Sequence, residues 1–230
     1  MTADVTTDVT VIIAVRDGAR YLPEALASVL GQTVPPAEVV VVDDGSTDGS
    51  GEVAAACAPG ARIVRQEPTG YAAAVNRGVA EAQSPLLAFL DADDRWSPTA
   101  IADRLGPIAA GQADVVAGTT QNFLCPDLPE DEAARIRLHE RPFRAEVLAA
   151  ALVRGDAFER VGPLDEGLRT ASAIDWMSRA RTEHVVFAFV DDLVLHRRIH
   201  AANLGRRDQA ARNADLLRVV RAHHARAQAR

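Results

Sequence analysis

The sequence predicts an α/β fold with a mostly parallel central sheet. Short apolar segments alternate with helical patterns through residue 119, an order typical of β–α–β units with right-handed crossovers. The first apolar segment, residues 9–15, is β-branched on both parities, which indicates a strand buried on both faces of a parallel sheet. The alternation then stops, so we expect two halves of one domain, at residues 1–118 and 119–205, and a C-terminal helix at 206–230.

Local patterns place the first elements in order. Residues 20–31 predict a helix, because their apolar side chains form one stripe that ends near a glycine. Residues 39–42 predict a second strand, and a helix ending at Ala56 follows it. Three side chains could cap that helix, namely Ser46, Thr47 and Asp48.

The alternation continues for two more strands. Residues 61–65 predict a weaker third strand, and the alanine-rich segment 70–83 predicts a helix. Residues 86–90 predict a fourth strand that stops at an acidic segment, after which Pro98 favours the start of a helix. A fifth strand is expected at residues 113–119.

The pattern changes after residue 120. Residues 121–146 are rich in Pro and charged side chains, so we expect an excursion over the surface, with a mobile lid as one form that it could take. The elements expected beyond it are an apolar stretch at 147–153, a turn at 162–165, a helix at 172–183, a strand at 185–190 and a helix from Asp208 onwards.

Composition and charge exclude several classes of protein. With 48% hydrophobic and 25% charged residues, the chain has an ordinary globular composition. The formal charge of −7 argues against a nucleic-acid-binding protein, which needs an excess of basic residues. No run approaches the roughly 18 apolar residues of a membrane span, and no signal peptide is recognisable. Two distant cysteines, Cys57 and Cys125, suit a reducing compartment, so we expect a cytoplasmic protein.

Acidic residues follow three of the predicted strands. In open α/β sheets, ligands bind at the carboxyl ends of the strands. Clustered carboxylates repel one another, so their convergence calls for a cation or for donor groups of a ligand. Any single cluster could instead cap a helix or form a turn, but three clusters on one sheet edge favour a site. Its candidate residues are Asp17, Asp43, Asp44, Asp91, Asp93 and Asp94.

The spacing of Asp91 and Asp93 indicates a metal site. Side chains alternate along an extended segment, so these two carboxylates are expected on the same side. Paired hard oxygen donors suit Mg or Mn, which in turn bind diphosphate oxygens. Such a D-x-D pair occurs by chance in many loops, and its position directly after a buried strand gives it weight.

Six segments together resemble family 2 glycosyltransferases. They occur in that family's order and span almost the whole chain: VTVIIAVRDGARYLPEALASVLGQT, VVVVDDGSTDGS, TGYAAAVNRGVAEAQ, LLAFLDADD, VGPLDEGLR and HRRIHAANLG. The resemblance implies the GT-A fold, with a Rossmann-like, nucleotide-sugar-binding half at residues 1–118 and a smaller acceptor-binding and catalytic half at residues 119–205.

For the donor, the resemblance implies a binding turn from Ala14 through Val15 to Asp17, with Asp17 near the ribose. It places the Asp44 carboxylate on the base. Asn76 is expected close to the nucleotide. Members of the family often carry Arg directly before this Asn, where this chain has Val75, so a phosphate contact would be missing or would come from Arg77.

The resemblance also implies a metal site and a base. Asp93 would ligate the metal, Asp91 would face the ribose or a metal-bound water, and His200 would be a further metal ligand. Asp175 would be the base that takes the proton of the acceptor hydroxyl, although Ile174 replaces the Glu that usually precedes that Asp. The simpler interpretation of Asp175 is a helix residue that stabilises the dipole.

Two basic residues near His200 complete the expected site. Arg197 and Arg198 would offset charge on the diphosphate leaving group, unless they belong to an ordinary basic loop. The function that we expect is transfer of a sugar, with inversion, from a UDP- or GDP-linked donor to an acceptor hydroxyl, with Mn or Mg as cofactor.

Alternatives and partners remain open at this stage. A nucleotidyltransferase would also use an α/β sheet with a carboxylate-bound metal, and a non-catalytic sugar-nucleotide-binding module would share the donor site. A P-loop ATPase is excluded because the Walker A motif is absent. The acceptor could be a glycan, a lipid-linked sugar, a peptide or a small natural product. No nucleic acid or transmembrane segment is expected, and a homodimer is left open.

Overall fold

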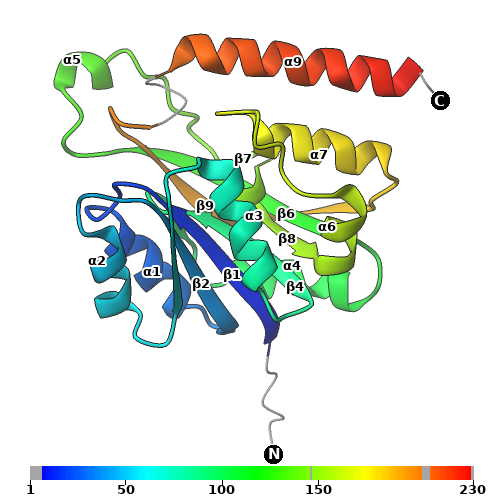
Figure 1. Cartoon of the computed structure of the whole chain (residues 1–230), viewed down its shortest axis with the longest axis horizontal. Coiled ribbons are helices and arrows are strands. Elements are labelled where there is room, and N and C mark those ends of the chain that lie inside the picture. Colours follow the sequence, from blue (N-terminus) through cyan, green and yellow to red (C-terminus); the bar gives the residue numbers. More distant parts are fainter. Residues whose placement is uncertain (1–6, 146, 204–207, 229–230) are drawn as a thin grey trace, which may run out of the picture.

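The computed structural model describes residues 7–145, 147–203 and 208–228. Within these ranges nine strands form one sheet in the order β3-β2-β1-β4-β8-β6-β9-β5, with β7 paired to β6. Helices cover both faces of the sheet (Figure 1). The α/β class and the mostly parallel sheet are therefore confirmed.

The first four strands form the parallel part of the sheet. Both neighbours of β1, which are β2 and β4, run parallel to it, and β3 runs parallel to β2. Three helices, α1, α2 and α3, connect these strands. The bounds are β1 Thr7–Val15, α1 Leu22–Leu30, β2 Pro36–Asp44, α2 Ser50–Cys57, β3 Arg62–Gln66, α3 Tyr71–Glu81 and β4 Leu86–Asp91.

The double-sided burial predicted for the first strand is confirmed. Val11 and Ile13 of β1 belong to one core cluster, with α1 and α4 (Ala100–Ala109), and Ile12 belongs to the other, with α3 and α6 (Gly155–Val161). All three side chains are at most 1% exposed. The sheet is thus covered on both faces, and the carboxyl ends of its parallel strands remain as the place for polar groups.

The second half adds strands of mixed direction. Two of them, β8 and β6, are antiparallel to their neighbours β4 and β8, whereas β9 runs parallel to β6. The remaining bounds are β5 Arg95–Trp96, β6 Val115–Leu124, α5 Glu130–Ala133, β7 Phe143–Arg144, the 3-10 helix η1 Leu148–Ala150, β8 Ala151–Arg154, α7 Ser172–Thr182, β9 Phe187–Ile199 and α9 Gln209–Gln228.

The largest differences from the sequence predictions lie in the second half of the chain. The fifth strand was expected to end at residue 119, but β6 continues to Leu124 because its polar end pairs with β9. The last strand was expected to end at residue 190, but β9 runs on to Ile199 past two exposed aspartates, where the pairing with β6 is irregular. Helix α6 was not predicted. Since β6 passes through residues 118 and 119, the two expected halves share one continuous sheet.

A glycine brings α3 close to β1. A Cβ built on Gly78 would lie 2.4 Å from Cγ2 of Ile12, nearer than real atoms approach. The helix can therefore sit directly on the strand only because this position has no side chain. The approach places Tyr71, the first residue of α3, at the carboxyl end of the sheet.

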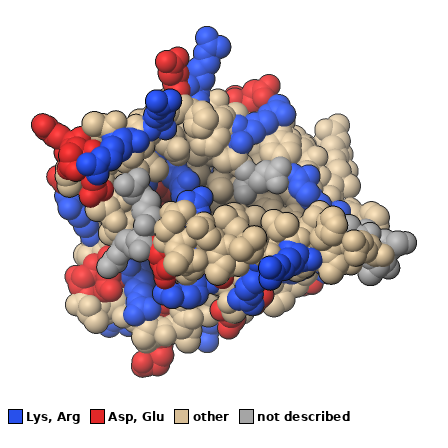
Figure 2. All heavy atoms as spheres, turned by 90° about the horizontal axis from the view of Figure 1, so that it is seen from above, with Lys and Arg blue, Asp and Glu red and all other residues tan. Residues whose placement is uncertain are grey.

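The C-terminal helix α9 lies beside α7 at the end of the molecule opposite the start of β1 (Figure 1). Val219 packs against Leu168 and Ala171, and buried Asp215 accepts hydrogen bonds from the backbone N–H and the hydroxyl of Thr170. Basic and acidic side chains are interspersed around the rim of the face that carries α9 (Figure 2). No described helix is both long enough and apolar enough to span a membrane.

Candidate active site

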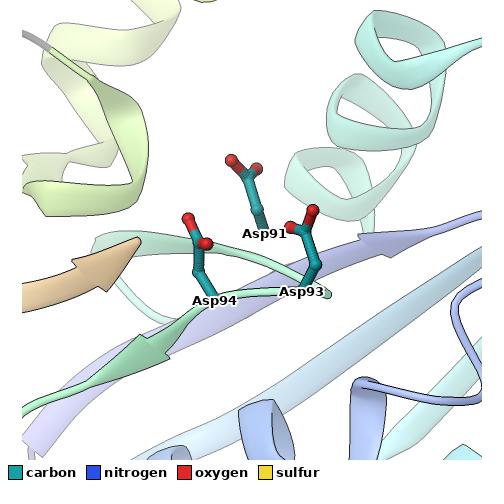
Figure 3. Close-up of side chains that lie close together, drawn as sticks. All are labelled: Asp91, Asp93 and Asp94. Atoms are coloured by element: carbon teal, nitrogen blue, oxygen red, sulfur yellow. The ribbon is translucent and has the colours of Figure 1, made fainter. Parts of the chain in front are cut away.

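Three carboxylates converge where β4 ends. Ligand oxygens of Asp91, Asp93 and Asp94 lie within 4.8 Å of one another, and the three side chains point to the same side (Figure 3). The Asp94 N–H donates to the Asp91 carbonyl at 3.0 Å, so the segment is a tight turn. The expected grouping of Asp91 and Asp93 is present, but it arises from this turn and not from alternation along an extended strand.

The ends of neighbouring strands supply further acidic groups. Ala14 of β1 pairs with Asp91, and Val15 pairs with Asp43 of β2. Because β1, β2 and β4 are parallel, their carboxyl ends meet at one edge of the sheet, as expected for an open α/β fold.

The charge of the triad is not fully compensated by the chain itself. Burial, reinforced by the neighbouring charge of Asp93, raises the pKa of Asp91 to about 6. The same causes, burial first, raise the pKa of Asp94 well above its usual value. Arg197 acts in the opposite direction on both groups, and Tyr71 donates a hydrogen bond to Asp91. A bound divalent cation would favour the ionised form of these carboxyls.

His200 reaches the same turn from the end of β9. Its Nε2 lies 2.8 Å from Oδ2 of Asp93, and the Asn203 side-chain amide donates to the same oxygen at 3.0 Å. The Ala202 N–H lies 3.3 Å from Nδ1 of His200, an acceptor role that puts the imidazole proton on Nε2 and makes His200 a donor to Asp93. To ligate a cation through Nε2, the neutral imidazole of His200 must instead carry its proton on Nδ1.

The chemistry of these donors fits Mg or Mn. Three carboxylates supply hard oxygen ligands, and a neutral imidazole is an accepted ligand of Mn. Asp91, Asp93 and His200 were expected as ligands and are brought together. Asp94 was expected in the acidic cluster but not as a ligand, and its oxygens also lie in the triad.

The two arginines of β9 differ in exposure and in their partners. Arg197 is exposed and lies close enough to the triad to influence the pKa values of Asp91 and Asp94. The Arg198 side chain is 5% exposed and its guanidinium binds Glu24 at 2.7 Å. Of the pair that was expected to face a diphosphate, only Arg197 is left with an exposed side chain.

The expected nucleotide residues on β1 and β2 lie at the same edge. Asp17 has a left-handed backbone (φ 50°), and its carboxylate accepts from the Thr47 N–H at 2.8 Å. Asp44 is buried and accepts from the backbone N–H groups of Thr69 and Gly70, each at 2.8 Å. Both carboxylates therefore order the loops that follow β2 and β3, which leaves their nucleotide contacts as predictions.

Asn76 and Arg77 are engaged within the chain. The Asn76 amide donates to the Leu164 carbonyl and accepts from the Leu164 N–H, at 3.0 and 2.8 Å, and thereby ties α3 to the turn after α6. Arg77 pairs with Glu81 on the exposed side of α3. The structure does not bring Arg77 to the triad through any contact among the described residues.

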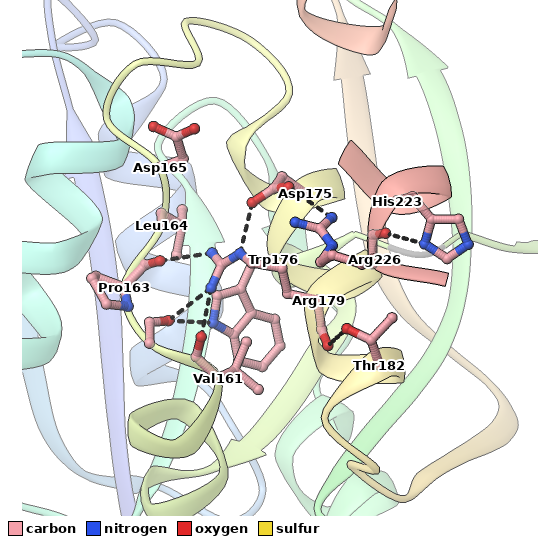
Figure 4. Close-up of polar contacts among 12 residues, drawn as sticks. Val161, Pro163, Leu164, Asp165, Asp175, Trp176, Arg179, Thr182, His223 and Arg226 are labelled. Carbon is pink, nitrogen blue, oxygen red and sulfur yellow. Dashed lines mark hydrogen bonds and ion pairs between the residues drawn. The ribbon is translucent and has the colours of Figure 1, made fainter. Parts of the chain in front are cut away.

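Asp175 is held by two arginines (Figure 4). One of its oxygens binds Nε of Arg179 at 2.7 Å and the other lies 3.4 Å from Nη2 of Arg226 on α9. Arg179 also donates to the carbonyls of Val161 and Pro163, so the pair joins α7 to the turn after α6. No contact among the described residues links Asp175 to the triad, and its role as base stays a prediction.

Most of the chain matches a known family. Residues 10–157 match the family model described as Glycosyl transferase family 2, which is well over half of the chain. The chain belongs to glycosyl transferase family 2. The family expected from the six sequence segments is thereby confirmed.

Two curated proteins from different organisms resemble parts of this chain. The succinoglycan biosynthesis protein ExoU of Rhizobium meliloti is 40% identical over 139 residues, which are 54% of this chain and 40% of ExoU. Glycosyltransferase AglE of Haloferax volcanii is 28% identical over 199 residues, which are 81% of this chain and 65% of AglE. The chain thus spans less than two thirds of the length of these relatives.

Solved structures support the GT-A fold of this family 2 chain. Staphylococcus aureus TarS 1-349, solved in complex with UDP-GlcNAc, superposes with a TM-score of 0.69 at 16% identity, covering 85% of this chain and 59% of that chain. A structure of the same fragment with UDP gives a TM-score of 0.68 at 17% identity, covering 83% of this chain and 60% of that chain. At such identities the likeness establishes the fold alone.

Several residues that contact the carboxylate triad, His200 or Arg198 could not be recognised from the sequence. Tyr71 heads an alanine-rich helix, and Glu24 and Tyr21 lie in and before α1, far along the chain from β9. Asn203 follows β9, and its amide reaches Asp93 only in the folded chain. Their roles depend on which elements the sheet brings together.

Proposed function

We propose that this family 2 chain is a metal-dependent glycosyltransferase that moves a sugar, with inversion, from a nucleotide-diphosphate donor to an acceptor hydroxyl. The observation that carries the proposal is the convergence of Asp91, Asp93, Asp94 and His200 at the edge where the parallel strands end. A UDP-linked sugar is the first donor to test, since TarS, which shares the fold, was solved with UDP and UDP-GlcNAc. A GDP-linked sugar is the second.

The chain's own residues divide the task as follows. Asp91, Asp93 and Asp94, with His200, would hold Mg or Mn, which would neutralise charge on the donor diphosphate. Asp17 and Asp44 would contact the ribose and the base. Arg197, the exposed cation beside the triad, would add positive charge where the diphosphate departs.

The transfer needs a proton acceptor. The acceptor oxygen forms a bond to the anomeric carbon, the bond from that carbon to the diphosphate breaks with its electron pair, and the hydroxyl proton goes to a base. We propose Asp175 as that base. Because both its oxygens contact arginines, this role requires that Arg226 release its oxygen when the acceptor binds.

The experiment measures nucleotide release. Purified protein is incubated with a panel of UDP- and GDP-sugars, with Mn, with Mg or with EDTA, and the released diphosphate is assayed. We expect release that needs the metal and is lost in Asp93→Asn but kept in Asp131→Asn, an exposed carboxylate on α5. Metal-independent release, or full activity of Asp93→Asn, would refute the proposal.

Adding a nucleoside triphosphate or candidate acceptors to this assay separates the alternative functions. A nucleotidyltransferase would release pyrophosphate from a nucleoside triphosphate. Donor binding without turnover, with every acceptor class supplied, would indicate a sugar-nucleotide-binding module. The division into a donor half and an acceptor half predicts that acceptor selectivity changes with substitutions between residues 119 and 205.

A further inference from the structure

Arg198 connects three separate parts of the site. Its Nε donates to the Asp93 carbonyl at 2.9 Å, and its backbone N–H donates to Oδ1 of Asp94 at 2.7 Å. Its Nη2 reaches across to Glu24 on α1 at 2.7 Å. The residue therefore joins β9 and α1 to the turn that carries the carboxylates, through both its main chain and its side chain.

Two aromatic rings enclose the Arg198 guanidinium. Its central carbon lies 4.8 Å from the centroid of the Tyr21 ring and 4.7 Å from that of the Phe123 ring, within the range of cation–π contacts. With only 5% of its side chain exposed, this guanidinium is fixed between the rings and is not available at the surface.

Tyr21 extends the same arrangement to the imidazole. The Tyr21 and His200 rings pack with centroids 4.7 Å apart at an angle of 52°. The Tyr21 hydroxyl oxygen lies 3.5 Å from the sulfur of Cys125, within hydrogen-bonding distance. One ring thus contacts both His200 and Arg198, so the position of the imidazole and that of the carboxylate turn depend on the same residue.

We infer that Tyr21 and Arg198 are positioning residues of the metal site: Arg198 fixes the Asp93–Asp94 turn, and the Tyr21 ring fixes the imidazole of His200. The inference rests on the proposed function, and it replaces the diphosphate contact expected for Arg198. Partners that orient metal ligands commonly change metal affinity by about 10- to 100-fold when they are removed.

The sign of the effect separates this role from simple electrostatics. Arg198 is a cation next to a proposed cation site, so its charge alone disfavours metal binding. If charge were its only influence, Arg198→Met would bind Mn more tightly. If Arg198 instead bound the diphosphate, the same variant would keep its Mn affinity without nucleotide and would lose affinity for the donor. A positioning role predicts weaker Mn binding in the absence of any nucleotide.

The test is a titration of the full chain with Mn, read by electron paramagnetic resonance of the free ion. We expect Arg198→Met and Tyr21→Leu to bind Mn about 10- to 100-fold more weakly than wild type. Tyr21→Phe keeps the ring and should bind as wild type does. Arg95→Met is the matched control: exposed Arg95 also stacks on Phe123, at 4.6 Å, and lies 3.7 Å from Glu24, but among the described residues its side chain forms no hydrogen bond or ion pair with the Asp93–Asp94 turn.

A milder variant guards against misfolding of Arg198→Met. Glu24 is half exposed, beside an open hollow of about 390 Å³, so Glu24→Gln should fold while it loosens the anchor of Arg198. A smaller loss of Mn affinity is expected there, with an unchanged melting temperature. If Glu24→Gln and Arg198→Met bound Mn as tightly as wild type and the control Arg95→Met, the inference would be overturned and the proposed function would stay intact. Absence of Mn binding by wild type would instead overturn the proposed function.

Discussion

The Nε2 atom of His200 lies 2.8 Å from Oδ2 of Asp93, although 107 positions separate the two residues in the chain. The contact joins the end of β9 to the turn after β4 and forms only because β9 continues past its apolar segment. The contact thus joins two side chains that were expected to ligate the same metal.

Substitution of His200 tests whether it is a ligand or orients Asp93. If His200 is a ligand, His200→Ala and His200→Gln should both bind Mn more weakly than wild type, by at least the roughly 10- to 100-fold that loss of an orienting partner costs. As a donor to Asp93 only, His200→Gln should retain most of the affinity, since a Gln amide can donate the same hydrogen bond. Mn titration measures both variants, with the exposed His224→Ala as control. Wild-type affinity in His200→Ala would exclude either role.

Asp175→Asn should abolish transfer while donor binding, measured by calorimetry, stays unchanged. The Asn cannot take a proton, and it also weakens the pair with Arg179, which should lower the free energy of unfolding by about 1–3 kcal/mol. Initial rates and urea denaturation give the two quantities. Retention of full turnover in this variant would remove Asp175 from the role of base.

Arg226→Ala tests the release that the role of Asp175 requires. The substitution frees one carboxylate oxygen while the contact with Arg179 remains. Turnover should therefore be equal to or higher than that of wild type. A loss of turnover as severe as that in Asp175→Asn would mean that the arginine pair serves to hold α9 on α7, and steady-state kinetics of both variants at matched concentrations would show it.

Asp43 should make stability sensitive to acid. Burial raises the pKa of its carboxyl, but hydrogen bonds from Ser46 and Arg65 outweigh burial and hold the pKa below its usual value. A pKa lowered on folding stabilises the protein above the unfolded value of about 3.9, and this contribution is lost as the pH falls through the folded pKa. Asp43→Asn should therefore be less stable at pH 7 and lose less stability below about pH 4. Parallel stability curves from urea denaturation would contradict this.

Gly78→Ala should destabilise the protein by crowding Ile12. Overpacking of a core costs about 1–3 kcal/mol, against a gain of at most about 1 kcal/mol in helix propensity. Gly60→Ala is the control, because a Cβ on Gly60, in the turn after α2, meets nothing within 4 Å. We expect a lower melting temperature for the first variant and an equal or higher one for the second. The opposite order would show that α3 can shift away from β1.

Much of the fold could be predicted because its signals are local. The buried run before Asp91 and the alternation of strands and helices each lie within a few residues, and family resemblance supplied the order. The extension of β9 to Ile199 could not be predicted, since Asp191 and Asp192 break the apolar pattern and only pairing with β6 continues the strand. Residue type alone also misjudged the surroundings of Arg198. Its partner Glu24 lies 174 positions away.

The site shows the same division. Asp91 and Asp93 could be recognised from their spacing after a strand, but the tight turn that groups them with Asp94 depends on a backbone hydrogen bond. Asp175 was singled out by its neighbourhood in sequence. Its two arginine partners come from the next turn of α7 and from α9, and the second of these contacts exists only in the folded chain.

The most direct test of the metal-assisted donor site is calorimetry of UDP binding with and without Mn. The proposal predicts that wild type binds UDP in the presence of Mn, that EDTA weakens this binding because it removes the cation that offsets the diphosphate charge, and that Asp93→Asn binds UDP equally weakly under both conditions. UDP binding of equal strength with Mn, with EDTA and in Asp93→Asn would contradict it.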